Sequence, residues 1–182
     1  MQIIPTTIKE VILFEPKIFK DHRGYFYESY NSESLAQIGI NSTFVQDNQS
    51  KSTKGVLRGL HFQTGEAAQA KLVRVLEGEV LDVAVDIRKN SPTFGKYVSA
   101  ILSAENNRQM FVPRGFAHGF VVLSETATFF YKCDNFYCKE LEGGIIYNDP
   151  EISIDWQIKT DEIILSEKDL ILPELKDAPI LF

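Results

Sequence analysis

The stretch VLDVAVDI, residues 80–87, constrains the fold more than any other part of the sequence. Alternate residues of an extended chain point to opposite faces, so a strict period of two predicts a strand. One face is aliphatic and the other carries two carboxylates: the first set is Leu81, Val83, Val85 and Ile87, and the second is Asp82, Ala84 and Asp86. The pattern therefore predicts a strand with two unlike faces.

Period-two or apolar runs of this kind recur along the chain, separated by short glycine, proline, asparagine or serine signals. They lie at 24–30, 43–46, 56–63, 72–76, 97–102, 109–112, 119–123 and 126–132. Helical signals are scarce and short: residues 32–38, started by Asn31 or Ser32, and the segment SEKDL, in which Ser166 precedes Asp169 by three positions. Many short strands with close turns predict an all-β protein of the sandwich or barrel type. We expect one domain over residues 1–182, a jelly roll with short peripheral helices.

Composition limits the possible partners. The formal net charge of −6 argues against a protein whose whole surface binds nucleic acid or an anionic membrane, although a local basic pocket stays possible. No apolar run approaches the roughly 20 residues of a membrane-spanning helix, and the start of the chain does not resemble a signal peptide. Cys133 and Cys138 fit neither a redox pair nor a zinc site and are read as free thiols. We expect a cytoplasmic protein.

Two segments combine histidine with glycine in otherwise apolar surroundings: VLRGLHFQ, which holds Arg58 and His61, and PRGFAH, which ends at His118. The second resembles the second motif of the cupins, small double-stranded β-helix barrels, whose metal-binding members use three histidines and a glutamate. Here Gln63 stands where a second histidine would be, and the cationic Lys71 lies where the acidic ligand is expected. An ammonium repels a divalent ion, so we expect no metal and no cofactor.

Each of these residues also has a structural interpretation. A histidine flanked by apolar residues is often a hydrogen-bonded core residue, and a lysine at the start of a strand is often a solvated end. The conjunction of Arg58, His61, Lys71 and His118 on segments that a barrel brings together favours a site.

Six blocks of the sequence, in order, resemble those of the dTDP-4-dehydrorhamnose 3,5-epimerases. They are FVQDNQSKS, VLRGLHFQ, KLVRVLEGEVLDVAVDIRKNSPTFG, VPRGFAHGF, FFYKCDNFY and YNDPEISIDW, and the similarity runs from about Phe14 to Pro173. The resemblance implies a cupin-type double-stranded β-helix without metal. It further implies a homodimer that inverts carbons C3 and C5 of a nucleotide-linked 4-keto-6-deoxy sugar.

The resemblance also implies roles for individual residues. His61 is the base, Asp169 orients it, Tyr131 is the acid and Lys71 stabilises the enolate oxygen. A neutral imidazole suits a base near pH 7, a phenol stays protonated there, and a cation stabilises charge that develops only in the transition state. Without the resemblance, Tyr131 reads as a core aromatic and Asp169 as a helix-capping residue.

The expected substrate-binding residues fall into two groups. Arg58 and Arg23 suit phosphate oxygens because a guanidinium binds them two at a time, although a solvated surface arginine is the alternative for Arg23. The resemblance implies that one set comes from the neighbouring subunit, whereas the rest lie in the subunit's own pocket. The first set is Phe19, Arg23 and Glu28, and the second is Gln46, Asn48, Arg58, His118 and Tyr137, the last of which stacks near the base.

Alternative functions stay open at this point. They are an epimerase of the same family that acts at one carbon or on a GDP- or CDP-linked sugar, a metal-dependent cupin oxygenase, and a noncatalytic module that binds sugar nucleotides. Gln63 and Lys71 disfavour the oxygenase. The sequence leaves undecided which nucleotide is bound, because small changes around Tyr137 would alter base selectivity.

Overall fold

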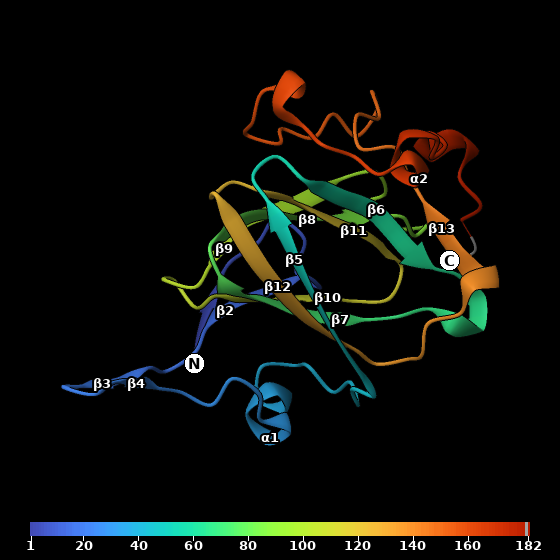
Figure 1. Ribbon diagram of the computed structural model, residues 1–182. Coiled ribbons are helices and arrows are strands. Elements are labelled where there is room, and N and C mark those ends of the chain that lie inside the picture. Colours follow the sequence, from blue (N-terminus) through green and yellow to red (C-terminus); the bar gives the residue numbers. More distant parts are fainter. Residues whose placement is uncertain (181) are drawn as a thin grey trace.

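The computed structural model describes residues 1–180 and 182 of the chain, and strands dominate it (Figure 1). The strands are β1 (Gln2–Ile4), β2 (Ile12–Glu15), β3 (Phe19–Asp21), β4 (Gly24–Phe26), β5 (Gln46–Thr53), β6 (Leu57–Gln63), β7 (Lys71–Glu77), β8 (Glu79–Asp86), β9 (Tyr97–Ser103), β10 (Gln109–Val112), β11 (Phe116–Val122), β12 (Thr126–Cys133) and β13 (Glu142–Gly144). The helices are α1 (Ser32–Ala36) and α2 (Glu167–Leu170), with short 3₁₀ turns at Gly65–Ala67, Lys139–Leu141, Thr160–Glu162 and Leu175–Asp177. The all-β class with short peripheral helices is confirmed.

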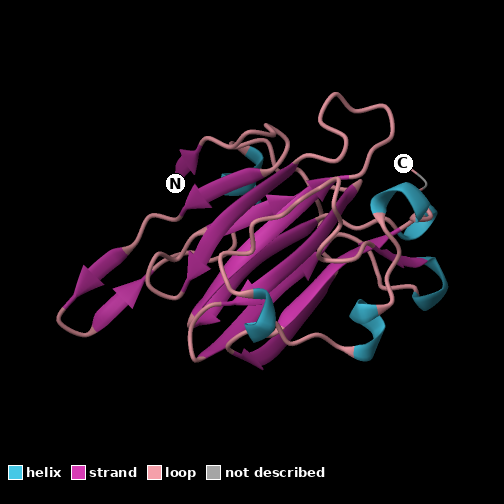
Figure 2. Cartoon of the chain, turned by 90° about the horizontal axis from the view of Figure 1, so that it is seen from above, coloured by secondary structure: helices cyan, strands magenta, loops and turns pink. Residues whose placement is uncertain are grey.

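Two antiparallel sheets pack face to face as a jelly roll. The first has the strand order β1-β2-β10-β7-β12-β5, and the second has the order β13-β6-β11-β8-β9. Strands that follow one another in the chain often lie in different sheets, as β6 and β7 do, so the chain crosses repeatedly between the layers. The hairpin β3-β4 forms a separate two-stranded sheet that projects away from the body (Figures 1 and 2). The expectation that residues 1–182 form one domain stays a prediction.

The strand β8 shows why its alternation is so regular. Leu81, Val83, Val85 and Ile87 belong to an apolar cluster on the outer face of the five-stranded sheet. Val80 and Ala84 belong instead to the cluster between the two sheets. The sheet is therefore buried on both faces, and the carboxylates of Asp82 and Asp86 lie on the inward-facing side of the strand.

The outer face of this sheet is covered by the C-terminal segment of the chain, residues 145–180. Ile145, Ile152, Trp156 and Leu175 pack against the aliphatic side chains of β6, β8 and β11. Figure 1 shows this segment, in orange and red, lying across those strands. On the opposite side of the molecule, Leu35 of α1 packs into a smaller cluster over the six-stranded sheet. These long segments are stabilised against the sheets by the hydrophobic effect, because their apolar side chains bury aliphatic surface.

The predicted elements agree with the structure where the sequence alternates and fail where it does not. The expected strand at 43–46 is wrong, because strand β5 begins at Gln46 and continues through the polar sequence QDNQSKST. The expected strand at 24–30 ends at Phe26. Both helix starts are confirmed, since Asn31 accepts a hydrogen bond from the backbone of Ser34 and Ser166 accepts one from that of Asp169. No helix of the described residues is long and apolar enough to span a membrane.

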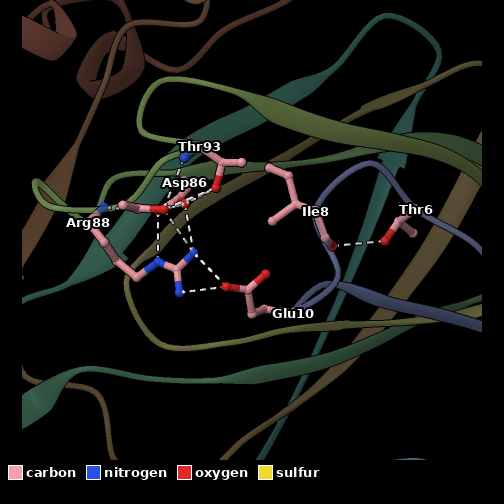
Figure 3. A network of polar contacts seen from close by, with 7 residues as sticks. Thr6, Ile8, Glu10, Asp86, Arg88 and Thr93 are labelled. Atoms are coloured by element: carbon pink, nitrogen blue, oxygen red, sulfur yellow. Dashed lines mark hydrogen bonds and ion pairs between the residues drawn. The ribbon is translucent and has the colours of Figure 1, made fainter.

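A buried carboxylate ties the β8–β9 connection to the N-terminal segment. Asp86 is fully buried and accepts hydrogen bonds from the guanidinium of Arg88 at 2.7 and 2.8 Å and from the hydroxyl of Thr93 at 2.6 Å. Arg88 also donates to Glu10 at 3.2 Å (Figure 3). Burial alone would raise the pKa of Asp86, but these bonds outweigh it and lower the pKa to about 2.

The linkage between this pKa and folding gives a first prediction. A carboxyl group whose pKa is lower in the folded chain stabilises it above about pH 4, and this contribution is lost as the pH falls toward 2. Asp86→Asn should therefore lower the free energy of unfolding by about 2 kcal/mol at pH 7. The difference from the wild type should shrink at pH 3, as measured by urea denaturation at both values. An equal difference at both pH values would contradict this account.

Candidate active site

A β-bulge in β6 turns both Arg58 and His61 toward the space between the sheets. In the pairing with β11, His61 lies opposite His118 and Arg58 lies opposite Phe120. Arg58 and His61 are three positions apart on β6, whereas their partners are two positions apart on β11, so β6 contains one extra residue. Residues two apart on β11 share a face, and therefore Arg58 and His61 share that face as well. Leu60 and Leu57 point to the outer cluster. The bulge explains how a core strand carries two polar side chains toward one cavity.

Glycines at the bulge allow the two strands to approach closely. A Cβ atom added to Gly59 would lie 2.6 Å from the Cα atom of Gly119, and the φ angle of Gly59 is +142°. Residues other than glycine rarely adopt that backbone conformation, and the backbone of Gly119 cannot move aside as a flexible side chain could. Gly59 is thus required both by its conformation and by the space available.

The cavity has a volume of about 530 Å³ and opens beside α2. Seven of the residues predicted from the sequence line it: Asn48, Arg58, His61, Lys71, His118, Tyr131 and Asp169. The five-stranded sheet contributes both histidines and Arg58, and the six-stranded sheet contributes Lys71, Tyr131 and Asn48. The two groups therefore face each other from opposite walls.

His61 and Asp169 form a hydrogen-bonded pair. Nε2 of His61 lies 2.6 Å from Oδ1 of Asp169, although the two residues are 108 positions apart. Ser166 caps the helix by accepting from the Asp169 backbone, which leaves the Asp169 carboxylate free for the imidazole. Asp169 is buried. Burial would raise its pKa, but the bond to His61 and the one to Ser166 together hold the pKa below its ordinary value.

Lys71 and Tyr131 lie together on the facing wall. Nζ of Lys71 is 5.9 Å from the centre of the Tyr131 ring. Burial lowers the pKa of Lys71, opposed by the negative charge of Asp82 and Glu142 and of the Cys133 thiol when ionised. Burial also raises the pKa of Tyr131 and so favours its neutral phenol. The wall thus presents an amine and a protonated phenol to the imidazole opposite.

His118 forms a second pair with a carboxylate inside the barrel. Its Nε2 lies 2.9 and 3.0 Å from the two oxygens of Asp82, and both side chains are buried. The imidazole also stacks at 6.1 Å on the ring of Phe129. His118 therefore lines the cavity and is also a buried histidine whose orientation is fixed by its hydrogen bond to Asp82.

Gln46 and Tyr137 lie at the rim and do not line the cavity itself. Oε1 of Gln46 accepts from the Tyr137 backbone, and the Tyr137 hydroxyl donates to Glu142 at 2.9 Å. This bond to Glu142 raises the pKa of Tyr137. Glu142 also pairs with Lys168 of α2 at 2.5 Å. The exposed Tyr137 ring is thus fixed beside the cavity mouth.

Phe19, Arg23 and Glu28 lie outside the cavity of their own chain. Arg23 is exposed on the β3-β4 hairpin and forms a forked pair with Asp21, and the Phe19 side chain is exposed on the same hairpin. Glu28 accepts a hydrogen bond from Asn31. The fold of one chain does not bring this set to the site, and its role across a subunit interface stays a prediction.

The polar groups near His61 and His118 are occupied by protein partners. Gln63 accepts from the backbone of Cys138, and each histidine uses Nε2 to contact a carboxylate. Across the residues that the structure describes, no group of three or more histidine, cysteine or carboxylate side chains is placed to hold a metal ion. The absence of a metal or cofactor stays a prediction.

Sequence reasoning did not assign roles to several residues around the cavity. Asp82 holds His118, and Lys168 and Glu142 join α2 to β13 at the mouth. The alternation of VLDVAVDI places the charged Asp82 on a buried strand, and this could have identified it as a site residue. No sequence pattern distinguishes Lys168 and Glu142, because surface lysines and glutamates are common.

The fold and these side chains define an acid–base enzyme built on a cupin-type jelly roll. The family model of the dTDP-4-dehydrorhamnose 3,5-epimerases matches residues 5–177. A curated relative of that name from Salmonella typhimurium is 56% identical over 179 residues, which cover 98% of this chain and 97% of the relative.

Solved structures agree with this match. The epimerase of that name from Elizabethkingia anophelis is 60% identical with a TM-score of 0.93, covering 97% of each chain. A Legionella pneumophila 3,5-epimerase, solved in complex with dTDP-4-keto-L-rhamnose, is 52% identical with a TM-score of 0.93, covering 97% of this chain and 93% of that one. The chain belongs to the dTDP-4-dehydrorhamnose 3,5-epimerase family and is an isomerase. The resemblance drawn from the six sequence blocks is confirmed.

The close approach at the bulge gives a second prediction. Gly59→Ala should lower the free energy of unfolding by about 2–4 kcal/mol, because strain at positive φ adds to a backbone clash. Gly39→Ala is the matched control, since Gly39 also has a positive φ but nothing lies within 4 Å of its added Cβ. Thermal and urea denaturation would measure both. Equal losses in the two variants would show that the strands have room at the bulge.

Proposed function

We propose that this protein converts dTDP-4-dehydro-6-deoxy-D-glucose to dTDP-4-dehydro-L-rhamnose by proton transfer at C3 and C5. The observation that carries the proposal is the opposition of His61, oriented by Asp169, to Lys71 and Tyr131 across one cavity. Such a set suits removal of a proton from a carbon beside a ketone and its return to the other face of that carbon. The names of the relatives supply the substrate class.

In the first half of each inversion, His61 takes the proton through the ring nitrogen that does not contact Asp169. The electron pair of the C–H bond moves to the C4 oxygen and forms an enolate. Asp169 stabilises the imidazolium that results, since a carboxylate fixes the tautomer and balances the new charge. Lys71 stabilises the enolate oxygen, a charge that is almost absent from the ketone.

In the second half, Tyr131 donates its phenolic proton to the opposite face of the carbon, and the enolate returns to a ketone. The phenol is available because burial raises its pKa. The phenolate regains a proton and His61 loses one, so the cycle leaves the enzyme unchanged. The walls of the cavity set the stereochemistry: His61 stands on the five-stranded sheet, and Tyr131 stands on the six-stranded sheet.

Binding of the nucleotide portion follows from charge and position. Arg58, held by Ser52 at 3.2 Å, and Lys168 place positive charge along the lining, which suits a diphosphate in an otherwise acidic protein. Asn48 adds an amide to the lining, and the exposed Tyr137 offers a ring against which a base can stack. The cytoplasmic location and the absence of nucleic-acid or membrane partners stay predictions.

We also propose a homodimer in which the β3-β4 hairpin of one subunit completes the cavity of the other. A two-stranded hairpin is marginally stable alone, and this one exposes Phe19, Tyr25 and Phe26 at 53%, 61% and 66%. Aromatic side chains exposed this far favour a partner surface. Arg23 on the same hairpin would add a second guanidinium to the phosphate subsite.

The catalytic roles give a third prediction. In heavy water the wild type should exchange the C3 and C5 protons of the dTDP-4-keto-6-deoxy sugar, as followed by proton NMR. His61→Asn should slow exchange at both carbons by about 100- to 10,000-fold with the fold retained. Tyr131→Phe should slow inversion more than proton loss, because it removes the acid but not the base. Retained exchange in the first variant, or equal effects in the second, would contradict the assigned roles.

The shared site gives a fourth prediction. Arg23→Ala and His61→Asn should each be inactive, yet a mixture dissociated and reassembled should recover about one quarter of wild-type activity, because half the dimers then hold one complete site. Arg23→Ala mixed with itself is the control. If the mixture stays inactive while size-exclusion chromatography shows mixed dimers, the hairpin does not serve its neighbour.

A further inference from the structure

Asp82 is a buried carboxylate that the mechanism above does not use. It lies on β8, its side chain is 0% exposed, and both of its oxygens contact Nε2 of His118. No other side chain of the described residues donates a hydrogen bond to it. A buried carboxylate with so few donors is costly unless positive charge lies nearby. Its environment therefore indicates a task beyond packing.

His118 and Lys71 line the same cavity from opposite sheets. The negative charge of Asp82 on β8 and of Glu142 on β13 opposes the lowering of the Lys71 pKa by burial. Glu142 shares its charge with Lys168 and its hydrogen bonding with Tyr137. Among the described residues, the hydrogen-bonding partner of the Asp82 side chain is His118. The direct effect of Asp82 on the site is therefore exerted through that imidazole.

We propose that Asp82 is a positioning residue that acts through His118. The Asp82 carboxylate accepts a hydrogen bond from the Nε2–H group of His118, which leaves Nδ1 as the nitrogen available to the sugar. The orientation and tautomer of an imidazole that lines the cavity then depend on one buried anion. This proposal rests on the proposed function and assigns the arrangement of the same site.

The kinetics of Asp82→Asn test the role of this carboxylate. The substitution keeps the size of the side chain but removes the charge that fixes the His118 tautomer and orientation. At pH 7 kcat should fall by about 10- to 100-fold with KM changed much less. A kcat at the wild-type value would overturn the role assigned to Asp82.

Asp86→Asn is the matched control for this experiment. Asp86 is equally buried and lies on the same strand and face as Asp82, but it pairs with Arg88 outside the cavity. Its loss should lower stability and leave kcat at the wild-type value. A fall in kcat of the same size in both variants would mean that the effect is merely structural, and the proposal would then be wrong.

The tautomer of His118 can be measured without any change to Asp82. Nitrogen-15 NMR of the histidine-labelled wild type, with the signal of His118 identified by its loss in His118→Asn, should show a protonated Nε2 at pH 7. An unprotonated Nε2 would overturn the proposal, even if Asp82→Asn fails to fold. If the wild type does not act on the dTDP sugar, the proposed function fails, whereas this tautomer measurement still decides whether Asp82 holds the proton.

Discussion

Burial of the five-stranded sheet on both faces is the constraint on which the rest of the structure depends. Its outer aliphatic face must be covered, and residues 145–180 provide the cover through Trp156 and its neighbours. The same segment then passes the edge of β6, where Ile164 exchanges backbone hydrogen bonds with Gly55 and Leu57. This path brings α2 to the cavity mouth and Asp169 to His61. The packing that excludes water thus also assembles the catalytic pair.

The inner face of the same sheet is polar at the positions that line the cavity. Polar side chains between two sheets are tolerated because each has a partner: His61 with Asp169, His118 with Asp82, and Arg58 with Ser52. Among the described residues, no buried side-chain nitrogen or oxygen lacks a hydrogen-bond partner. These hydrogen bonds hold His61, His118 and Arg58 in one arrangement, which proton transfer to a defined face of a carbon requires.

Low local dielectric links this geometry to the chemistry. Burial makes the phenol of Tyr131 harder to ionise and the amine of Lys71 easier to deprotonate. The first effect serves an acid directly. The second opposes the stabilisation of an enolate, and neighbouring carboxylates are needed to offset it. The buried Asp82 and the partly buried Glu142 supply negative charge that opposes this lowering of the Lys71 pKa.

The sequence by itself determined the all-β class, the two faces of β8, both helix starts and the family. The first three depend on residue order over short spans, where the two-residue period of a strand or the side chain of an N-cap acts locally. The family is recognised from six short blocks that occur in order along most of the chain. Strand β5 escaped prediction because it faces solvent on one side and the cavity on the other, so no apolar alternation marks it.

Only the tertiary structure decided which residues meet. The bulge at Gly59 put Arg58 and His61 on one face, the packing of the tail placed Asp169 beside an imidazole 108 positions away, and Asp82 came to hold His118. The physical reason is that these contacts join segments distant in the chain. Their formation depends on how the two sheets and the covering segment pack around the cavity, and this packing cannot be predicted from a local pattern of residues.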